Sequence, residues 1–134
     1  MLASLLYTRN KMEYNYSIDM VNKIIHVKVT GDIHETDAAE MGVLLRRKAL
    51  DLNCKLFLDL SDAISHILMG TAYFWVERRY DVIDERMRYV STAYLINPEQ
   101  ESYYSFIQTV CLNHGIKVRT FNSEDDAINW LKGV

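Results

Sequence analysis

The sequence contains few of the residues that mark linkers, loops and disulfide frameworks. Its 134 residues include one proline, five glycines and two cysteines. This composition leaves no stretch that resembles a flexible linker or a low-complexity segment. Cys54 and Cys111 lie far apart in apolar surroundings and lack CxxC spacing. We therefore expect buried free thiols in a reducing compartment, which favours the cytoplasm.

Basic charge and long apolar runs are also scarce. The formal net charge is −3, and the tightest basic run is Arg46–Lys48, which we expect on a solvated helix face. Nucleic acids and anionic membranes attract proteins that carry a concentrated basic face, so neither is a predicted partner. The apolar opening Met1–Tyr7 is too short to span a bilayer and has no basic residues before it. No integral membrane association is predicted.

Residues that carry catalysis or bind metals are present without the spacing that these functions need. No two histidines are three or four residues apart, and none has a cysteine partner at zinc-like spacing. His34 and Asp37 have the types of a base and its orienting acid, but at a loop-to-helix junction local capping is the commoner role. An enzyme would require His34, Asp37, Asp59 and His66 to converge in one cleft. We predict no catalytic residue, no metal site, no cofactor and no enzymatic activity.

The residues that are present suit one globular domain. About half are apolar (49%) and a quarter are charged (25%), which is enough to build a core in a chain of this length. The strand pattern begins after Met12. Residues 1–12 are therefore predicted to be a loosely attached extension, and residues 13–134 to form the domain. Residues 1–11 contain no complete amphipathic period, so we expect them to be dispensable for folding.

The first predicted unit of the domain is an antiparallel hairpin. Apolar and polar residues alternate over Tyr14–Met20, a turn follows at Asn22 and Lys23, and a second strand covers Ile24–Val29. We expect this strand to end at Gly31, in a turn that requires a positive φ.

A helix and a buried strand are predicted next. The helix runs from Thr36 to about Leu52, with Asp37 and Glu40 as a capping box. Its inward positions are Ala38, Met41, Leu44, Leu45, Ala49 and Leu52. The almost continuously apolar segment Lys55–Leu60 is typical of a central parallel strand. The segment Asp59–His66 at its carboxyl end is a candidate functional edge.

The rest of the chain continues to alternate between helix and strand. The predicted elements are a long helix over 66–86, a strand over 89–96, a helix over 99–113 after Pro98, a strand over 116–121 and a final helix capped by Ser123. The order is ββαβαβαβα. This is an α/β domain whose mixed, mostly parallel sheet carries an N-terminal antiparallel hairpin strand.

Three segments together resemble a known family. They are Val29–Ile33 leading into Thr36–Ala38, Leu58–Ser61 at the end of the central strand, and the closing Phe121–Leu131. The chain resembles the STAS fold, and specifically the SpoIIAA-like group of small proteins related to anti-sigma factor antagonists. The resemblance covers nearly everything from Glu13 to Leu131. It implies a regulatory module that binds proteins or ligands, and not an enzyme.

The chain departs from that family at the position of the regulatory serine. Anti-sigma factor antagonists carry Asp-Ser-Ser/Thr-Gly at the start of the helix after the central strand, and a kinase phosphorylates a serine there. This chain has Ile64-Ser65-His66-Ile67 instead. Ser65 is the candidate phosphorylation site, since a helix N-terminus receives a phosphate. The alternative is that Ser65 only caps the helix.

The predicted long helix has two apolar faces. Leu68, Met69 and Ala72 begin its core face, which leaves Ile67 and Phe74 on the other side, near Arg78. That side is covered by another element of the chain, by a protein partner or by a second copy in a homodimer. The predicted partner-binding residues are Ser61, Asp62, Ser65, His66, Ile67, Phe74 and Arg78.

Two functions follow from these observations. The leading hypothesis is a cytoplasmic, non-enzymatic STAS-like regulatory module that binds a protein. The alternative is a module that binds or carries a small apolar or anionic ligand, in a pocket between the long helix and the sheet. Trp75 and Tyr104 are the candidate pocket residues, although aromatic residues at such positions are more often part of a core. This alternative rests on related folds of the wider STAS and SEC14-like group, which hold such molecules.

Overall fold

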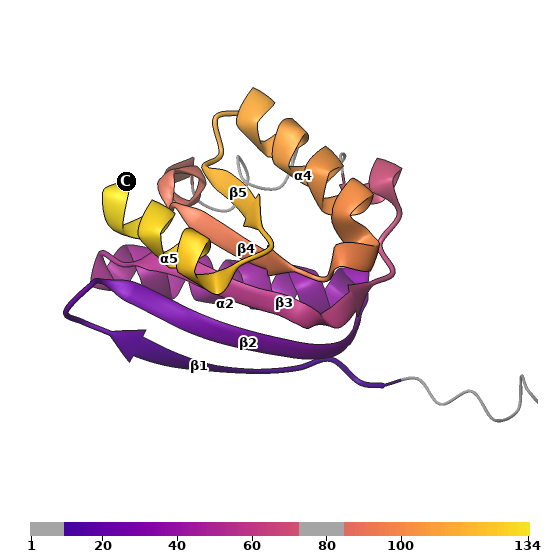
Figure 1. Ribbon diagram of the computed structural model, residues 1–134, viewed down its shortest axis with the longest axis horizontal. Coiled ribbons are helices and arrows are strands. Elements are labelled where there is room, and N and C mark those ends of the chain that lie inside the picture. The colour runs from indigo at the N-terminus through magenta and orange to yellow at the C-terminus, as the bar shows by residue number, and fades with distance from the viewer. Residues whose placement is uncertain (1–9, 73–84) are drawn as a thin grey trace, which may run out of the picture.

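The computed structural model describes residues 10–72 and 85–134, which form a five-stranded sheet with helices on both faces (Figure 1). The strands lie in sequence order across the sheet. They are β1 (Glu13–Asp19), β2 (Ile24–Ile33), β3 (Lys55–Ser65), β4 (Thr92–Ile96) and β5 (Val118–Phe121). β1 is antiparallel to β2, and the later strands are parallel to their neighbours. This confirms the predicted mixed sheet and its N-terminal hairpin.

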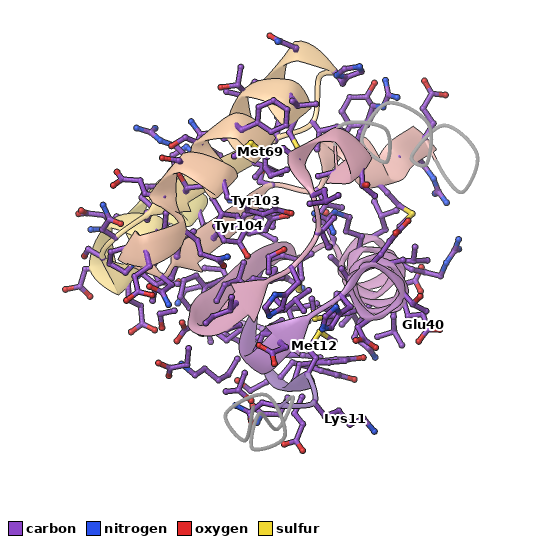
Figure 2. All side chains as sticks on the ribbon, turned by 90° about the vertical axis from the view of Figure 1, so that its right-hand side faces the viewer. Lys11, Met12, Glu40, Met69, Tyr103 and Tyr104 are labelled. Atoms are coloured by element: carbon purple, nitrogen blue, oxygen red, sulfur yellow. The ribbon has the colours of Figure 1, made fainter. Side chains whose placement is uncertain are left out.

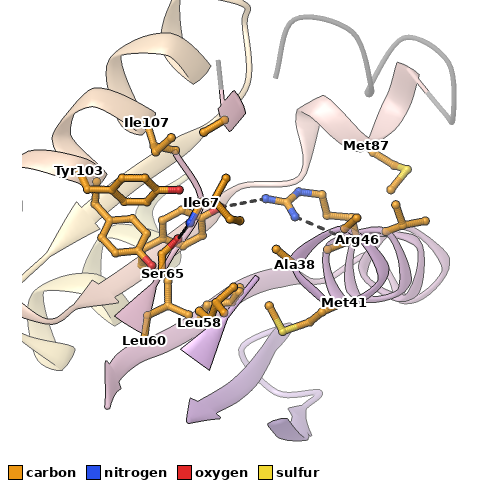
Figure 3. A pocket seen from close by; sticks show the side chains of 17 residues that line it. Ala38, Met41, Arg46, Leu58, Leu60, Ser65, Ile67, Met87, Tyr103 and Ile107 are labelled. Atoms are coloured by element: carbon orange, nitrogen blue, oxygen red, sulfur yellow. Dashed lines mark hydrogen bonds between the residues drawn. The ribbon is translucent and has the colours of Figure 1, made fainter. Parts of the chain in front are cut away.

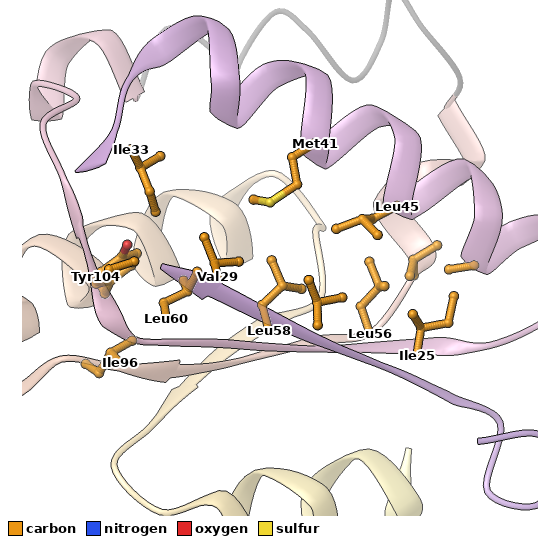
Figure 4. Packing of buried hydrophobic residues seen from close by; sticks show 14 of the residues in the cluster. Ile25, Val29, Ile33, Met41, Leu45, Leu56, Leu58, Leu60, Ile96 and Tyr104 are labelled. Atoms are coloured by element: carbon orange, nitrogen blue, oxygen red, sulfur yellow. The ribbon is translucent and has the colours of Figure 1, made fainter. Parts of the chain in front are cut away.

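Helices cover the two faces of the sheet unequally. α2 (Glu35–Leu52) and α4 (Glu101–Asn113) lie on one face, and α5 (Glu124–Gly133) lies on the other (Figure 4). Two short 3₁₀ helices, η1 (Glu85–Tyr89) and η2 (Pro98–Gln100), precede β4 and α4. The larger core therefore forms between the sheet and α2, and a smaller one forms beneath α5.

Alternation along the central strands divides their side chains between these two cores. Ile25, Val27 and Val29 of β2 belong to the core under α2, whereas Ile24 packs with Ala127 and Leu131 of α5. β3 supplies Leu56, Leu58 and Leu60 to the first core and Phe57 to the second. A strand that is covered on both faces buries its side chains on both, which explains why the Lys55–Leu60 part of β3 is almost continuously apolar.

Gly31 has the predicted positive φ, but β2 does not end there. Its φ is +88°, and the strand continues to Ile33. The reason is the N-terminal segment: Lys11 pairs with Asp32, and a Cβ on Gly31 would lie 2.3 Å from the carbonyl oxygen of Lys11. Gly31 thus permits a close approach of two backbones inside the sheet. The expectation of a turn after the strand was wrong.

The end of the predicted N-terminal extension is attached to this same part of β2. The N–H of Asp32 donates to the carbonyl of Asn10 (3.0 Å), and the N–H of Asn10 donates to the Asp32 carboxylate (3.1 Å). Met12 packs against the core under α2. Residues 1–9 lie outside the described residues, so the dispensability of that part stays a prediction.

The start and the inward face of α2 differ from the prediction. The N-cap is His34, which makes no side-chain capping bond, so the expected capping box of Asp37 and Glu40 was wrong. Leu44 is exposed, whereas Arg46 is buried. The buried face of α2 is therefore shifted by about one residue from the predicted face. It includes the charged side chain of Arg46.

After β3, helical structure begins later than predicted. β3 runs to Ser65, and the helix begins only at Met69, whereas the prediction placed its start at His66. The side chain of Gln100 holds Ser65 in the extended form: Oε1 accepts from the Ser65 N–H (2.8 Å), and Nε2 donates to its carbonyl (3.0 Å). Residues 73–84, which include the predicted site residues Phe74, Trp75 and Arg78, lie outside the described part of the chain.

The C-terminal elements follow the prediction with small shifts. Ser123 caps α5 by accepting from the N–H of Asp126, and Gly115 follows α4 with a φ of +73°. β4 begins at Thr92 and β5 at Val118, later than the apolar runs that predicted them.

Both cysteines are buried free thiols, as predicted. Burial raises the pKa of the Cys111 thiol to about 11, so its reactive thiolate is scarce at pH 8. We expect a disulfide reagent such as DTNB to modify native protein slowly at pH 8 and to titrate two thiols after unfolding in urea. Rapid modification of two thiols in the native state would contradict this burial.

Candidate functional site

The candidate site lies where β2 and β3 end, at the end of the molecule that faces the viewer in Figure 2. A cavity of about 180 Å³ lies between α2, α4 and the sheet (Figure 3). Most of its described lining is apolar and includes Ile33, Ala38, Met41, Leu58, Leu60 and Ile107. Small residues on α2, Ala38 among them, leave space beside the sheet.

One cationic side chain reaches this cavity from α2. Arg46 is only 5% exposed, and its Nη2 donates to the Tyr94 hydroxyl (3.2 Å) while Nη1 lies 3.5 Å from the carbonyl oxygen of Gly42 (Figure 3). Arg46 was expected on a solvated face together with Arg47, which is indeed exposed. A buried charge needs hydrogen-bonding partners. For Arg46 they include Gly42, one turn earlier in α2, and Tyr94 of β4.

Tyrosines of β4 and α4 form the other polar part of the lining. Tyr104, a predicted pocket residue, lies edge-to-face with Tyr103 (5.0 Å between ring centroids) and with Tyr94 (6.0 Å). Burial raises the pKa of Tyr104 well above its usual range and also raises the pKa of Tyr103, against the effect of a hydrogen bond with Ser65. Both phenols are therefore neutral at physiological pH and keep a proton to donate.

Two predicted partner-binding residues line the cavity. Ser65 is half-buried beside Tyr103, and Ile67 packs against the cores under α2 and α4. Ser65 thus lies at the end of a strand and not at a helix N-terminus, because Gln100 fixes its backbone. The helix-end phosphate site that the sequence suggested is not formed at Ser65 in this structure. Its phosphorylation stays a prediction.

A second polar cluster lies beside the ends of β2 and β3. His34 and His66 stack in parallel, with ring centroids 4.9 Å apart, and His66 Nε2 lies 2.9 Å from Oδ1 of the buried Asp32. Asp59 instead hydrogen-bonds Ser61 and Lys28. The enzymatic convergence that would join Asp59 to the two histidines is therefore not formed. Within residues 10–72 and 85–134, no three His, Cys, Asp or Glu side chains are placed to hold a metal ion.

Ser61 and Asp62, two further predicted partner-binding residues, belong to an ion-pair cluster. Lys28 Nζ lies 3.1 Å from Asp59 and 2.7 Å from the exposed Asp62, and Ser61 donates its N–H and its hydroxyl to Asp59. Burial raises the pKa of Asp59, but the bonds from Ser61 and Lys28 outweigh it and leave that pKa lowered. The hydrogen bond to Asp62 is the main cause that raises the pKa of Lys28.

Ser61→Ala is expected to raise the pKa of Asp59, because it removes one of the bonds that favour the carboxylate. Stability from this lowered pKa is present above the unfolded-state pKa of about 3.9 and is lost as pH falls through the folded-state value. We expect the variant to be less stable by about 1 kcal/mol at pH 7, and by less at pH 2. A carboxyl NMR titration and urea unfolding, with Ser17→Ala on the exposed β1 as control, measure both effects. An unchanged Asp59 titration would contradict the assignment.

Comparison with known proteins rests on structure. No family model matches the sequence, and no curated protein matches it significantly. An anti-sigma factor antagonist from Mycobacterium paratuberculosis aligns over 95% of this chain and 99% of its own, with a TM-score of 0.58 and 11% identity. A DUF3478-family protein with a SpoIIAA-like fold from Shewanella loihica PV-4 aligns over 93% and 97%, with a TM-score of 0.53 and 14% identity. The chain has a SpoIIAA-like fold. This confirms the fold that the sequence resembles.

In this SpoIIAA-like fold, the carboxyl end of β3 and the residues that follow it include exposed apolar side chains that sequence reasoning missed. Ile64 is 41% exposed, Leu68 76% and Met69 42%. Helical periodicity assigned Leu68 and Met69 to the core and Ile67 to the outer side, and the structure reverses this. The reason is that Ile67 lies between the end of β3 at Ser65 and the start of helical structure at Met69, so helical spacing does not apply to it. In the described parts of the SpoIIAA-like domain, no helix is long and apolar enough to cross a membrane.

Proposed function

We propose that this chain is a non-enzymatic regulatory module that binds another protein at the carboxyl ends of its parallel strands. The observation that carries the proposal is the exposure of Ile64, Leu68 and Met69 within one short segment. Exposed apolar side chains that gather in one place mark interaction surfaces more often than scattered ones do. The similarity to an anti-sigma factor antagonist, a protein named for its action on another protein, supports the same function.

Polar residues beside this segment fit the rim of such a surface. Asp62 and His66 are both exposed, and each already has an ion-pair or hydrogen-bond partner within the domain. Interfaces commonly combine an apolar centre with a polar rim. Of the predicted partner-binding residues that the structure describes, Asp62 and His66 are best placed for this role.

Leu68→Asp is expected to weaken binding of the partner protein strongly, because it places an unpaired charge at the centre of the apolar surface. The tagged chain is used to capture proteins from a native lysate of its source, and bound proteins are quantified by mass spectrometry. Val21→Asp is the matched control, since Val21 is 92% exposed in the β1–β2 connection, at the opposite end of β2 from Ile33 and away from the carboxyl ends of the parallel strands β2 and β3. We expect Leu68→Asp to reduce capture at least about tenfold and Val21→Asp to leave it unchanged.

Circular dichroism is the check that both variants are folded. Equal capture by the wild type and Leu68→Asp would contradict the proposed surface, as would equal loss in both variants. The predicted homodimer is a separate outcome of the same design. If the captured protein is a second copy, sedimentation of the wild type at tens of micromolar gives a dimer that Leu68→Asp converts to a monomer.

A second candidate function is the binding of a small ligand. The cavity beside Tyr104 favours it, because the described lining combines an apolar interior with polar groups at few positions. This function would be compatible with the first, since Ser65 and Ile67 connect the cavity to the exposed segment that follows them.

A further inference from the structure

We propose that the cavity binds a small uncharged molecule with an apolar body and one carbonyl oxygen, and that the Tyr104 hydroxyl donates a hydrogen bond to this oxygen. The inference rests on the second candidate function and names the class of ligand. It starts from one residue. Tyr104 lines the cavity and is only 5% exposed, and its hydroxyl has no hydrogen-bond partner among the residues that the structure describes.

The described contacts of Tyr104 are made by its ring. It lies edge-to-face with Tyr94 and Tyr103 and packs in the core under α2, and its hydroxyl oxygen lies on the α2 side of the ring (Figure 4). Most buried polar groups in proteins have a hydrogen-bond partner, because an unpaired group loses its bond with water and gains none in return. A ligand oxygen in the cavity would supply this partner to Tyr104.

Two hydroxyls of the cavity wall favour an acceptor on the ligand. Burial raises the pKa of Tyr104, so its phenol keeps a proton to donate. The Tyr94 oxygen already accepts a hydrogen bond from Arg46 (3.2 Å), which makes the Tyr94 proton a stronger donor (Figure 3). A carbonyl oxygen has two lone pairs and no proton. It can therefore accept from Tyr104 and from a second donor, and it brings no donor that would stay unpaired.

The described wall disfavours a charged ligand. Arg46 is the only charged side chain among the described lining residues, and it already has partners within the domain, Tyr94 and Gly42 among them. A carboxylate would therefore find no unpaired cation on the described wall, and a buried charge without a partner is costly. Most of the other described lining is apolar, which suits an uncharged ligand body.

The size of the cavity limits the ligand. Its volume is about 180 Å³. An apolar cavity of about 150 Å³ holds a benzene molecule, and pockets for drug-sized ligands begin at about 300 Å³. The apolar body therefore corresponds to one aromatic ring or a chain of roughly six to eight carbons. Acetophenone and methyl pentyl ketone are uncharged carbonyl compounds of this size.

The test measures binding of these two ketones to the full chain. Each is paired with its hydrocarbon analogue, in which a CH₂ group replaces the carbonyl oxygen, and benzoate tests the effect of charge. Titrations are followed by ¹H–¹⁵N NMR at the amides of lining residues. We expect at least one ketone to shift the amides of Ala38, Ile67 and Tyr104. We expect benzoate to bind more weakly than acetophenone, because its charge would be buried unpaired.

A variant then assigns the recognition of the carbonyl to Tyr104. Tyr104→Phe is expected to weaken binding of that ketone at least about fivefold, the effect of one hydrogen bond, and to leave its hydrocarbon within about twofold. The infrared carbonyl stretch of the bound ketone should lie at lower frequency in the wild type than in this variant, because a hydrogen bond weakens the C=O bond. Tyr89→Phe, the same change at an exposed tyrosine, is the matched control and should bind like the wild type.

The same variant tests the starting observation without a ligand. The Tyr104 hydroxyl has no partner in the described part of the domain, so its removal is expected to leave the melting temperature of the free protein unchanged or to raise it. A clearly lower melting temperature of Tyr104→Phe would show that the hydroxyl already forms a hydrogen bond within the protein. That result would overturn the proposal.

The binding outcomes separate the two levels of the inference. If Tyr104→Phe weakens a ketone and its hydrocarbon alike, or changes neither, or if benzoate binds more tightly than acetophenone, the carbonyl class is wrong and the cavity remains a ligand site. If no probe shifts the lining amides, both the inference and the second candidate function are wrong. Ala38→Leu, which fills the cavity from α2, is expected to abolish binding of every probe that the wild type binds.

Discussion

Gly31→Ala is expected to lower the free energy of unfolding by roughly 2–5 kcal/mol, because two separate costs add at this position. The φ of Gly31 is +88°, a conformation that residues with a Cβ adopt only with strain. The new Cβ would also lie 2.3 Å from the carbonyl oxygen of Lys11 and 3.2 Å from the Cα of Met12. Both neighbours are backbone atoms, so relief requires the N-terminal segment to move away from β2. Urea unfolding of the two proteins measures the difference.

Gly115→Ala is the matched control for this prediction. Gly115 also has a positive φ, +73°, but a Cβ there would meet nothing within 4 Å. The control therefore carries the conformational cost alone, about 1–2 kcal/mol. If the two substitutions lower the free energy of unfolding equally, the N-terminal segment moves away from the new Cβ without a loss of stability, and its contact with β2 is weak.

Local signals predicted most of the fold. The alternation of Tyr14–Met20 and Ile24–Val29 identified the hairpin, and the apolar run Lys55–Leu60 identified the central parallel strand. Ser123 predicted the start of α5 because a cap depends on residues close in the chain. These predictions are correct because residues close in the sequence determine each of these features.

The errors arise where distant residues decide the structure. Ser65 is extended because the side chain of Gln100, 35 residues away, bonds to its backbone. Gly31 lies inside a strand because Lys11 pairs beside it. Neither partner is visible in the sequence around the residue concerned. Helical spacing continued past Ser65 therefore placed Leu68 and Met69 in the core, although both are exposed.

Sequence reasoning reached one of the residues around the cavity. Tyr104, a predicted pocket residue, lies on the cavity wall, and its role in ligand binding stays a prediction. The burial of Arg46 was missed because periodicity treats arginine as a surface residue. A signal for Arg46 does exist. Gly42 precedes it by one helical turn and Ala49 follows it by three residues, so Arg46 shares a stripe of small residues that leaves room for a long side chain.

Removal of residues 1–12 is expected to destabilise the domain by about 2–4 kcal/mol, through the loss of two hydrogen bonds and one packed side chain. The carbonyl of Asn10 accepts from the N–H of the buried Asp32, and the N–H of Asn10 donates to its carboxylate. Without them, Asp32 keeps the contact with His66 but loses its backbone partner. Removal of Met12 also exposes the part of the core under α2 against which its side chain packs.

Removal of residues 1–9 alone is the matched control. It keeps Asn10, Lys11 and Met12, and the sequence of 1–9 contains no complete amphipathic period, so we expect the melting temperature to change by only a few degrees. Thermal unfolding of the wild type and the two truncated chains, followed by circular dichroism, compares them directly. A full effect from the shorter deletion would place the important contacts within residues 1–9. No effect from the longer one would show that the pairing of Lys11 with Asp32 does not stabilise β2, and the cost of Gly31→Ala should then fall to that of Gly115→Ala.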